Sequence, residues 1–177
     1  MYDDIRRLRG IAGVGRGGIA VDYFRKGAIL DETGTYRYLL WRSWDASKPM
    51  VTFIMLNPST ADANIDDATI RRCVGFADSW GYGSIEVVNL FAYRATHPEV
   101  LKGCDDPIGP ENDDYISISA ARSRLIIAAW GANGNFKNRD KAVIESLGSV
   151  HCIDISKEGH PKHPLYLKAD LKPRLLA

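Results

Sequence analysis

Four short apolar runs in the sequence each end in residues that could bind a ligand or take part in a reaction. The runs cover residues 51–56, 85–88, 125–129 and 151–155. The residues that follow them are Asn57-Pro58-Ser59-Thr60, Asn89-Leu90-Phe91, Trp130-Gly131, and a loop that contains His160 and His163. If the runs are parallel strands, their carboxyl ends lie along one edge of a sheet, where open α/β proteins bind ligands. The sequence therefore predicts one site that these four endings share.

Two asparagines stand at the first two endings. Pro58 stops the strand ladder and fixes the turn behind Asn57, whose amide can accept a hydrogen bond from a water and donate one to a ligand. An amide is not a strong general base, and an Asx turn followed by a hydroxyl cap is the structural alternative. The Asn89 amide ends an apolar strand and must find a partner. That partner is either backbone in a turn or the edge of a planar ligand such as a base.

The loop after the last run presents His160 and His163, each directly before a proline. A proline pushes the preceding residue into extended geometry, so both rings project from a stiffened loop. An imidazole there could stabilise charge that develops on a leaving group. The alternative is a proline-stiffened surface turn. Cys152 lies near the two histidines in the sequence, but no second ligand pair exists, so we predict no metal site.

The remaining polar candidates flank these motifs. Asp62 could orient a water or a histidine, although solvated acids are common in loops. Ser59 has no histidine and acid at matching spacing, which argues against a serine hydrolase. Four cations could form a patch that faces phosphates, or simply a solvated face: Arg71, Lys137, Arg139 and Lys162.

The composition restricts the class of protein. A chain of 177 residues with 45% apolar residues suits one domain with a sizeable core. A net charge of +1 excludes a strongly basic nucleic-acid binder, so any contact with nucleic acid would come from a local patch. Three scattered cysteines favour a reducing compartment. With no apolar run near the roughly 20 residues of a membrane span and no signal peptide, we expect a cytoplasmic protein without a membrane partner.

The first 26 residues read as an arm that precedes a single α/β domain at residues 27–177. Residues 13–18 match the GxGxxG pattern, but the sequence predicts no buried strand before them and no clear helix after them, so an irregular arm is favoured over a dinucleotide site. Residues 28–32 and 36–41 then predict a β-hairpin at the edge of the sheet. Alternating aromatics and arginines in its second strand suggest one buried and one wet face.

From residue 51 onward, strands alternate with helices. The helices are expected at residues 66–80, with Asp66 as the N-cap and Gly81 at the end, from Pro110 onward, and at residues 138–147. Such alternation predicts a three-layer α/β/α fold with a central, mainly parallel four-stranded sheet, in addition to the hairpin. The loop at residues 96–110 is expected to contain one short helical turn.

In their order and strand context, the four endings resemble the uracil-DNA glycosylase superfamily. The matching residues are Asn57-Pro58, Asn89, Trp130-Gly131, and either His160-Pro161 or His163-Pro164. The resemblance implies that Asn57 holds the attacking water, that Asn89 reads the base, and that one histidine stabilises the departing base. It implies no metal and no organic cofactor. An asparagine at position 57 is similar to the mismatch-specific branch rather than to the branch with aspartate.

A second resemblance covers nearly the whole chain from Ala28. The segment Met55-Leu-Asn-Pro-Ser-Thr-Ala-Asp62, together with Asn89-Leu-Phe-Ala92 and His163-Pro-Leu-Tyr166, is similar to an uncharacterised family of small bacterial and phage proteins. This likeness implies no activity.

Together these observations predict an enzyme that hydrolyses the N-glycosidic bond of a nucleobase, in DNA or in a smaller nucleotide or nucleoside. The alternative is a binding module on the same fold that holds a nucleotide or nucleic acid without turnover.

Overall fold

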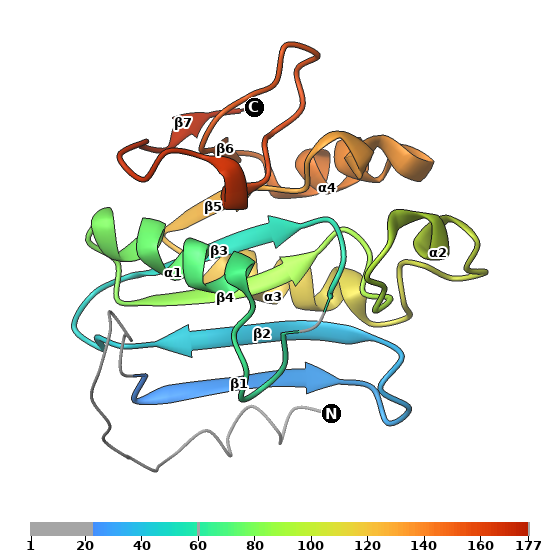
Figure 1. The fold of residues 1–177 in the computed structure, drawn as a ribbon, viewed down its shortest axis with the longest axis horizontal. Coiled ribbons are helices and arrows are strands. Elements are labelled where there is room, and N and C mark those ends of the chain that lie inside the picture. Colours follow the sequence, from blue (N-terminus) through green and yellow to red (C-terminus); the bar gives the residue numbers. More distant parts are fainter. Residues whose placement is uncertain (1–22, 60, 177) are drawn as a thin grey trace.

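A seven-stranded sheet forms the centre of the molecule, in a computed structural model that describes residues 23–59 and 61–176 (Figure 1). In chain order the strands are β1 (Arg25–Leu30), β2 (Arg37–Ser43), β3 (Met50–Met55), β4 (Ser84–Asn89), β5 (Leu125–Ala128), β6 (His151–Cys152) and β7 (Arg174–Leu175). Their order across the sheet is β1-β2-β4-β3-β5-β6-β7. The four inner strands β4, β3, β5 and β6 are parallel, and the other neighbours pair antiparallel.

The α/β class and the hairpin are confirmed, but the expected four-stranded sheet is too small. Strand β2 pairs with β4 from Leu40 to Ser43, so the hairpin continues the parallel strands in one sheet. A two-residue strand, β7, adds to the other side. Strand β1 begins at Arg25, within the last residues that the sequence assigned to the arm. The GxGxxG stretch of the arm, at residues 13–18, lies outside the described residues.

Helices lie on both faces of the sheet (Figure 1). They are α1 (Ala68–Ser79), α2 (Pro98–Lys102), α3 (Asn112–Arg122), α4 (Arg139–Leu147) and the 3-10 helices η2 (Ala132–Asn138) and η3 (Pro164–Tyr166). Side chains alternate across each strand, so each face has its own core. Phe53 and Val87 pack with Ile70 of α1 on one face, whereas Ile54 and Val88 pack with α3 and α4 on the other.

Helix α1 begins one residue later than the sequence suggests. Its N-cap is Asp67, whose carboxylate accepts a hydrogen bond from the Ile70 amide at 2.8 Å. Asp66, the expected cap, instead pairs with Arg42 of β2. Gly81 follows the helix with a φ of +86°, a left-handed conformation that glycine adopts without strain.

The short helical turn expected in the loop at residues 96–110 is α2. No helix in the described part of the chain is long and apolar enough to cross a membrane.

Candidate functional site

The parallel strands bring the four polar endings to one edge of the sheet. Met55 of β3 is the register partner of Asn89 of β4, and the Leu90 amide donates to the Met55 carbonyl at 2.9 Å. Beyond β5, the Gly131 amide donates to the Pro161 carbonyl at 2.9 Å. The expectation that the endings adjoin along the carboxyl edge is therefore confirmed.

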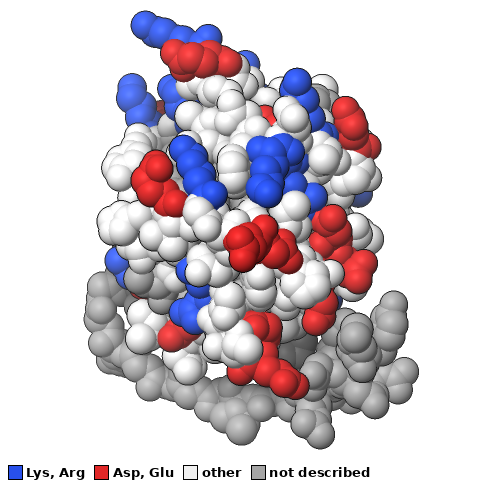
Figure 2. All heavy atoms as spheres, turned by 90° about the vertical axis from the view of Figure 1, so that its right-hand side faces the viewer, with Lys and Arg blue, Asp and Glu red and all other residues white. Residues whose placement is uncertain are grey.

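Figure 2 shows this edge, the side toward which β3 and β4 point in Figure 1. Lys and Arg side chains lie mainly in the upper half of the face, on the side of β5 and β6. Asp and Glu side chains dominate the lower half, on the side of the hairpin. An anionic ligand would therefore be favoured over the upper half.

Asn57 is anchored by its amide nitrogen. Its Nδ2 donates to the Ala95 carbonyl at 2.7 Å and to the Pro58 carbonyl at 3.1 Å. Pro58 is buried, and its carbonyl also accepts from the Ala95 amide, so the turn is held on both sides. Within the described chain, Oδ1 of Asn57 has no partner, which leaves an acceptor in a fixed place.

Asn89 is fully buried, and neither side-chain atom has a hydrogen-bond partner among the described residues. It lies on the α1 face beside Met55, because register partners in parallel strands point to the same side. Two buried polar atoms without hydrogen bonds lower the stability of the folded protein. Such atoms are rare in native proteins, so a ligand that would bond to them is one explanation.

The two histidines lie in different surroundings. His163 is the N-cap of η3, and its Nδ1 accepts a hydrogen bond from the Leu165 amide at 3.3 Å. Burial lowers the pKa of His163, and the nearby Asp67 carboxylate opposes that shift. The ring is therefore neutral at pH 7 and carries its proton on Nε2. His160, by contrast, closes a turn in which its amide donates to the Ser156 hydroxyl at 3.3 Å.

Asp62 has a structural task. One of its oxygens accepts from the amides of Asn64 at 2.7 Å and Ile65 at 2.8 Å. These backbone hydrogen bonds lower the pKa of Asp62, so it is ionised at neutral pH. Ser59 is partly buried, and Thr60 lies outside the described residues.

The candidates after β4 and β5 are buried on the opposite face of the sheet. Phe91 is fully buried and packs on Phe136, with ring centroids 5.5 Å apart. Trp130 is 3% exposed, and its Nε1 is buried with no partner in the described chain. Gly131 has a φ of +74°. In this arrangement Phe91 belongs to the core, so it offers no face on which a base could stack.

The four basic candidates do not form one patch. Arg139 is 7% exposed, donates to the Leu90 carbonyl at 2.9 Å and pairs with Asp113, so it belongs to the interior. Lys162 pairs with Asp154 at 2.6 Å. Arg71 and Lys137 are exposed; Arg71 donates to the Asp66 carbonyl at 2.6 Å, and Lys137 lies over the Phe136 ring.

Two buried arginines of β2 were missed by the sequence reasoning, which gave that strand one wet face. Arg42 is fully buried: its Nε pairs with Asp66 at 2.6 Å and its Nη2 donates to the Asp62 carbonyl at 2.7 Å. Arg37 is 3% exposed, and its Nη1 donates to the Ala61 carbonyl at 2.6 Å. Both fasten the segment between β3 and α1 to the hairpin. The sequence of β2 does contain an indication that these arginines are buried. Aromatic residues stand on both sides of its arginines, which fits a strand that is covered on both faces.

Arg37 is also electrostatically unusual. Burial lowers its pKa to about 10, against the attraction of Asp67, and the charges of Arg94 and Arg42 lower it further. No carboxylate of the described residues lies within ion-pair distance of Arg37 or Arg94. The Arg37 guanidinium donates to the Ala61 carbonyl and the Arg94 guanidinium to the Gly34 carbonyl, so both are held by backbone oxygens.

No group of three or more His, Cys, Asp or Glu side chains could hold a metal ion in residues 23–59 and 61–176.

Residues 37–165 match the model of a family described as a protein of unknown function, DUF1643. The chain belongs to this family. The match contains every candidate at the carboxyl edge, and the two arginines of β2 as well. Searches of curated proteins and of solved structures found no match. The expectation of an uncharacterised family is confirmed.

Proposed function

We propose that this member of the DUF1643 family is a uracil-DNA glycosylase-like enzyme that hydrolyses the N-glycosidic bond of a nucleobase. The observation that carries the proposal is the pair of amides at the ends of β3 and β4. The nitrogen of Asn57 is fixed, and no described residue donates to its carbonyl oxygen; the fully buried Asn89 has a donor and an acceptor without partners among the described residues.

The two amides suit different tasks in this reaction. The oxygen of Asn57 accepts a hydrogen bond from the attacking water and so orients it toward C1′ of the sugar. A nucleobase presents a donor beside an acceptor on its edge, which is the pair that Asn89 leaves unused. Binding of a base would thus relieve the cost of the two buried unpaired atoms.

The reaction moves charge toward the base. As the bond from C1′ to the base nitrogen breaks, the base takes the electron pair, the sugar becomes cation-like, and the water oxygen then bonds to C1′. The proton that the water loses passes through solvent to the departed base, which leaves as the neutral free base. Neutral His163 donates from Nε2 and stabilises the charge on the departing base. The carboxylates that stabilise such a cation in stronger catalysts are replaced here by an amide, so we expect a slow enzyme.

The test is release of free base from oligonucleotides that contain deoxyuridine or a mismatch, and from the corresponding nucleotides. In DNA the base must be flipped out of the stack, at a cost of a few kcal/mol, and mismatched bases are flipped most easily. Asn57→Ala should lower the rate at least tenfold, and Asn57→Asp should retain or raise it, because a carboxylate activates water better. Equal rates in Asn57→Ala and the unmodified protein would remove Asn57 from the mechanism.

The amide in place of a carboxylate at position 57 favours a second function, that of a non-catalytic binding module for a nucleotide or nucleic acid. In that case the protein would bind DNA with an affinity that falls steeply with salt, and no base would be released. Affinity for nucleosides without salt dependence, together with base release, would point to a small-molecule substrate.

A further inference from the structure

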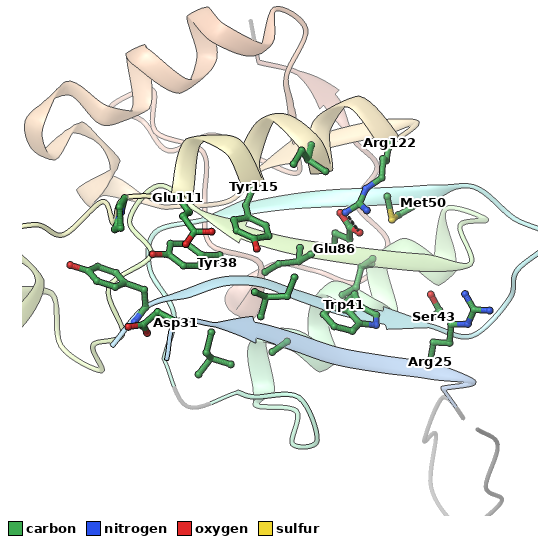
Figure 3. A pocket seen from close by; sticks show the side chains of 18 of the residues that line it. Arg25, Asp31, Tyr38, Trp41, Ser43, Met50, Glu86, Glu111, Tyr115 and Arg122 are labelled. Atoms are coloured by element: carbon green, nitrogen blue, oxygen red, sulfur yellow. Dashed lines mark hydrogen bonds and ion pairs between the residues drawn. The ribbon is translucent and has the colours of Figure 1, made fainter. Parts of the chain in front are cut away.

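A groove of about 860 Å³ runs between the hairpin and α3, on the face of the sheet opposite α1 (Figure 3). Its walls come from β1, β2, β4 and α3, and none of the candidate residues discussed above lines it. A volume of this size is within the range of small-molecule sites, about 300–1,000 Å³.

The floor of the groove contains a tryptophan in a fixed position. A Cβ added to Gly27 of β1 would lie 2.1 Å from Cζ2 of Trp41, so the indole lies directly over that glycine. Farther along, Tyr38 stacks on Tyr115 of α3, with ring centroids 5.2 Å apart and planes at 6°. Flat aromatic surfaces therefore stand at two places along the groove (Figure 3).

Glu86 of β4 supplies an unsatisfied acceptor beside the indole. It is the register partner of Trp41 and is 7% exposed. Its Oε1 pairs with Arg122 at 2.6 Å, whereas its Oε2 is buried without a hydrogen-bond partner in the described part of the chain. An ionised carboxylate oxygen only accepts hydrogen bonds, so the missing partner is an N–H or O–H donor.

The groove is acidic overall. Four carboxylates and two guanidiniums line it, which gives a net charge of −2. The carboxylates are Asp31, Glu32, Glu86 and Glu111, and the guanidiniums are Arg25 and Arg122. At one end of the groove, burial together with Glu111 and Asp31 raises the pKa of Tyr38 to about 12. The charge favours a cation over a neutral or negative ligand.

We propose that this groove binds a planar organic cation of the amidinium or guanidinium type. One N–H of the cation donates to Oε2 of Glu86, and its flat face lies against the indole of Trp41. Both contacts are strong ones for this chemistry, since charged donors bind carboxylates well and tryptophan is the best aromatic partner for a cation. The proposal does not depend on the base site, because the two sites share no residue.

Benzamidine is the probe, and the neutral benzamide, which has nearly the same shape, is its control. Both are titrated into the full chain by calorimetry and by tryptophan fluorescence. Benzamidine should bind and change the emission, and benzamide should bind at least tenfold more weakly. Trp41→Phe should remove most of the fluorescence change. Equal affinity for the two compounds, or no binding at millimolar benzamidine, would overturn the proposal.

Two substitutions locate the contact. Glu86→Gln should weaken benzamidine at least tenfold, and Glu145→Gln on the exposed side of α4 should leave its affinity unchanged. Because Glu86 also holds Arg122, thermal unfolding checks that the Glu86→Gln chain is folded. If it is not, Glu111→Gln decides the matter: a loss of affinity of threefold or more supports the proposal, and an unchanged affinity refutes it.

Discussion

Arg42 and Asp66 form an ion pair of 2.6 Å between Nε and Oδ1 in which the arginine side chain is fully buried. The pair joins β2 to the segment that leads from the Asn57 turn into α1, and Tyr23 donates a further hydrogen bond to Asp66 at 2.8 Å. The position of the proposed site therefore depends on a contact that lies outside it.

Removal of Arg42 should destabilise the fold strongly. Arg42→Ala leaves Asp66 without its cation and the carbonyl of Asp62 without its donor. Loss of one partner of a buried pair costs about 3–5 kcal/mol. Urea unfolding measures the change, and Lys48→Ala is the matched control. Its pair with Asp45 is solvent-exposed, so the control should change stability by less than about 1 kcal/mol. Similar losses in the two variants would contradict the structural role of Arg42.

Asn89→Leu should separate stability from function. The substitution removes two buried polar atoms that have no partner in the described chain, so the free energy of unfolding should rise by about 1–2 kcal/mol. Release or binding of a base should be lost at the same time. If Asn89→Leu were less stable than the unmodified protein, the Asn89 amide would already have hydrogen-bond partners in the folded protein without a ligand.

His163 should make stability depend on pH. Its folded-state pKa is lowered from 6.5, so the unfolded chain binds the proton more readily. Stability therefore falls as the pH drops from about 6.5 toward the lower folded-state pKa. Above about pH 6.5 the ring is neutral in both the folded and the unfolded chain, so this loss of stability is absent. His163→Gln should flatten that part of the profile, measured by urea unfolding between pH 5 and 7.5. His160→Gln serves as the comparison, and an identical profile for His163→Gln and the unmodified protein would argue against a buried neutral ring.

Gly134→Ala should disturb Trp130. The new Cβ would lie 2.1 Å from Cδ1 of Trp130, so the ring must leave its buried place, at a cost of about 1–3 kcal/mol. Near-ultraviolet circular dichroism and thermal unfolding report the change. The control is Gly75→Ala on the exposed side of α1, where the added Cβ would have no atom within 4 Å apart from its chain neighbours and the helix's own backbone. It should stabilise the helix by about 0.5–1 kcal/mol.

Most strands and helices could be predicted from the sequence, because each is indicated by residues that are close together in the chain: an apolar run and the polar residues that end it. The four parallel strands, the hairpin and the helices are where the pattern put them, within a few residues. The prediction for the start of α1 was wrong by one residue, and the reason is a contact at long range. Both Asp66 and Asp67 can cap a helix, but Asp66 forms an ion pair with Arg42 of β2, so Asp67 is the cap.

Side-chain partners at long range could not be predicted in this way. Arg139 has the position of a surface cation at the start of a helix, yet it turns inward to the Leu90 carbonyl. Arg37 and Arg42 became interior residues because β2 is covered on both faces. In each case the deciding contact is with a residue at least 20 positions away.

The strand order has a consequence for how the protein folds. The ends of β3 and β4, which carry Asn57 and Asn89, adjoin only after α1 has crossed from β3 to β4, and Arg72 of α1 reaches the Leu167 carbonyl across 95 residues of sequence. Contacts of such separation form slowly, because the chain must close long loops before it gains their energy. A nascent or partly folded chain would therefore contain the hairpin and helices, but the ends of β3 and β4 would not yet lie side by side. Binding of a ligand at these ends would then indicate that the parallel strands of the sheet have assembled.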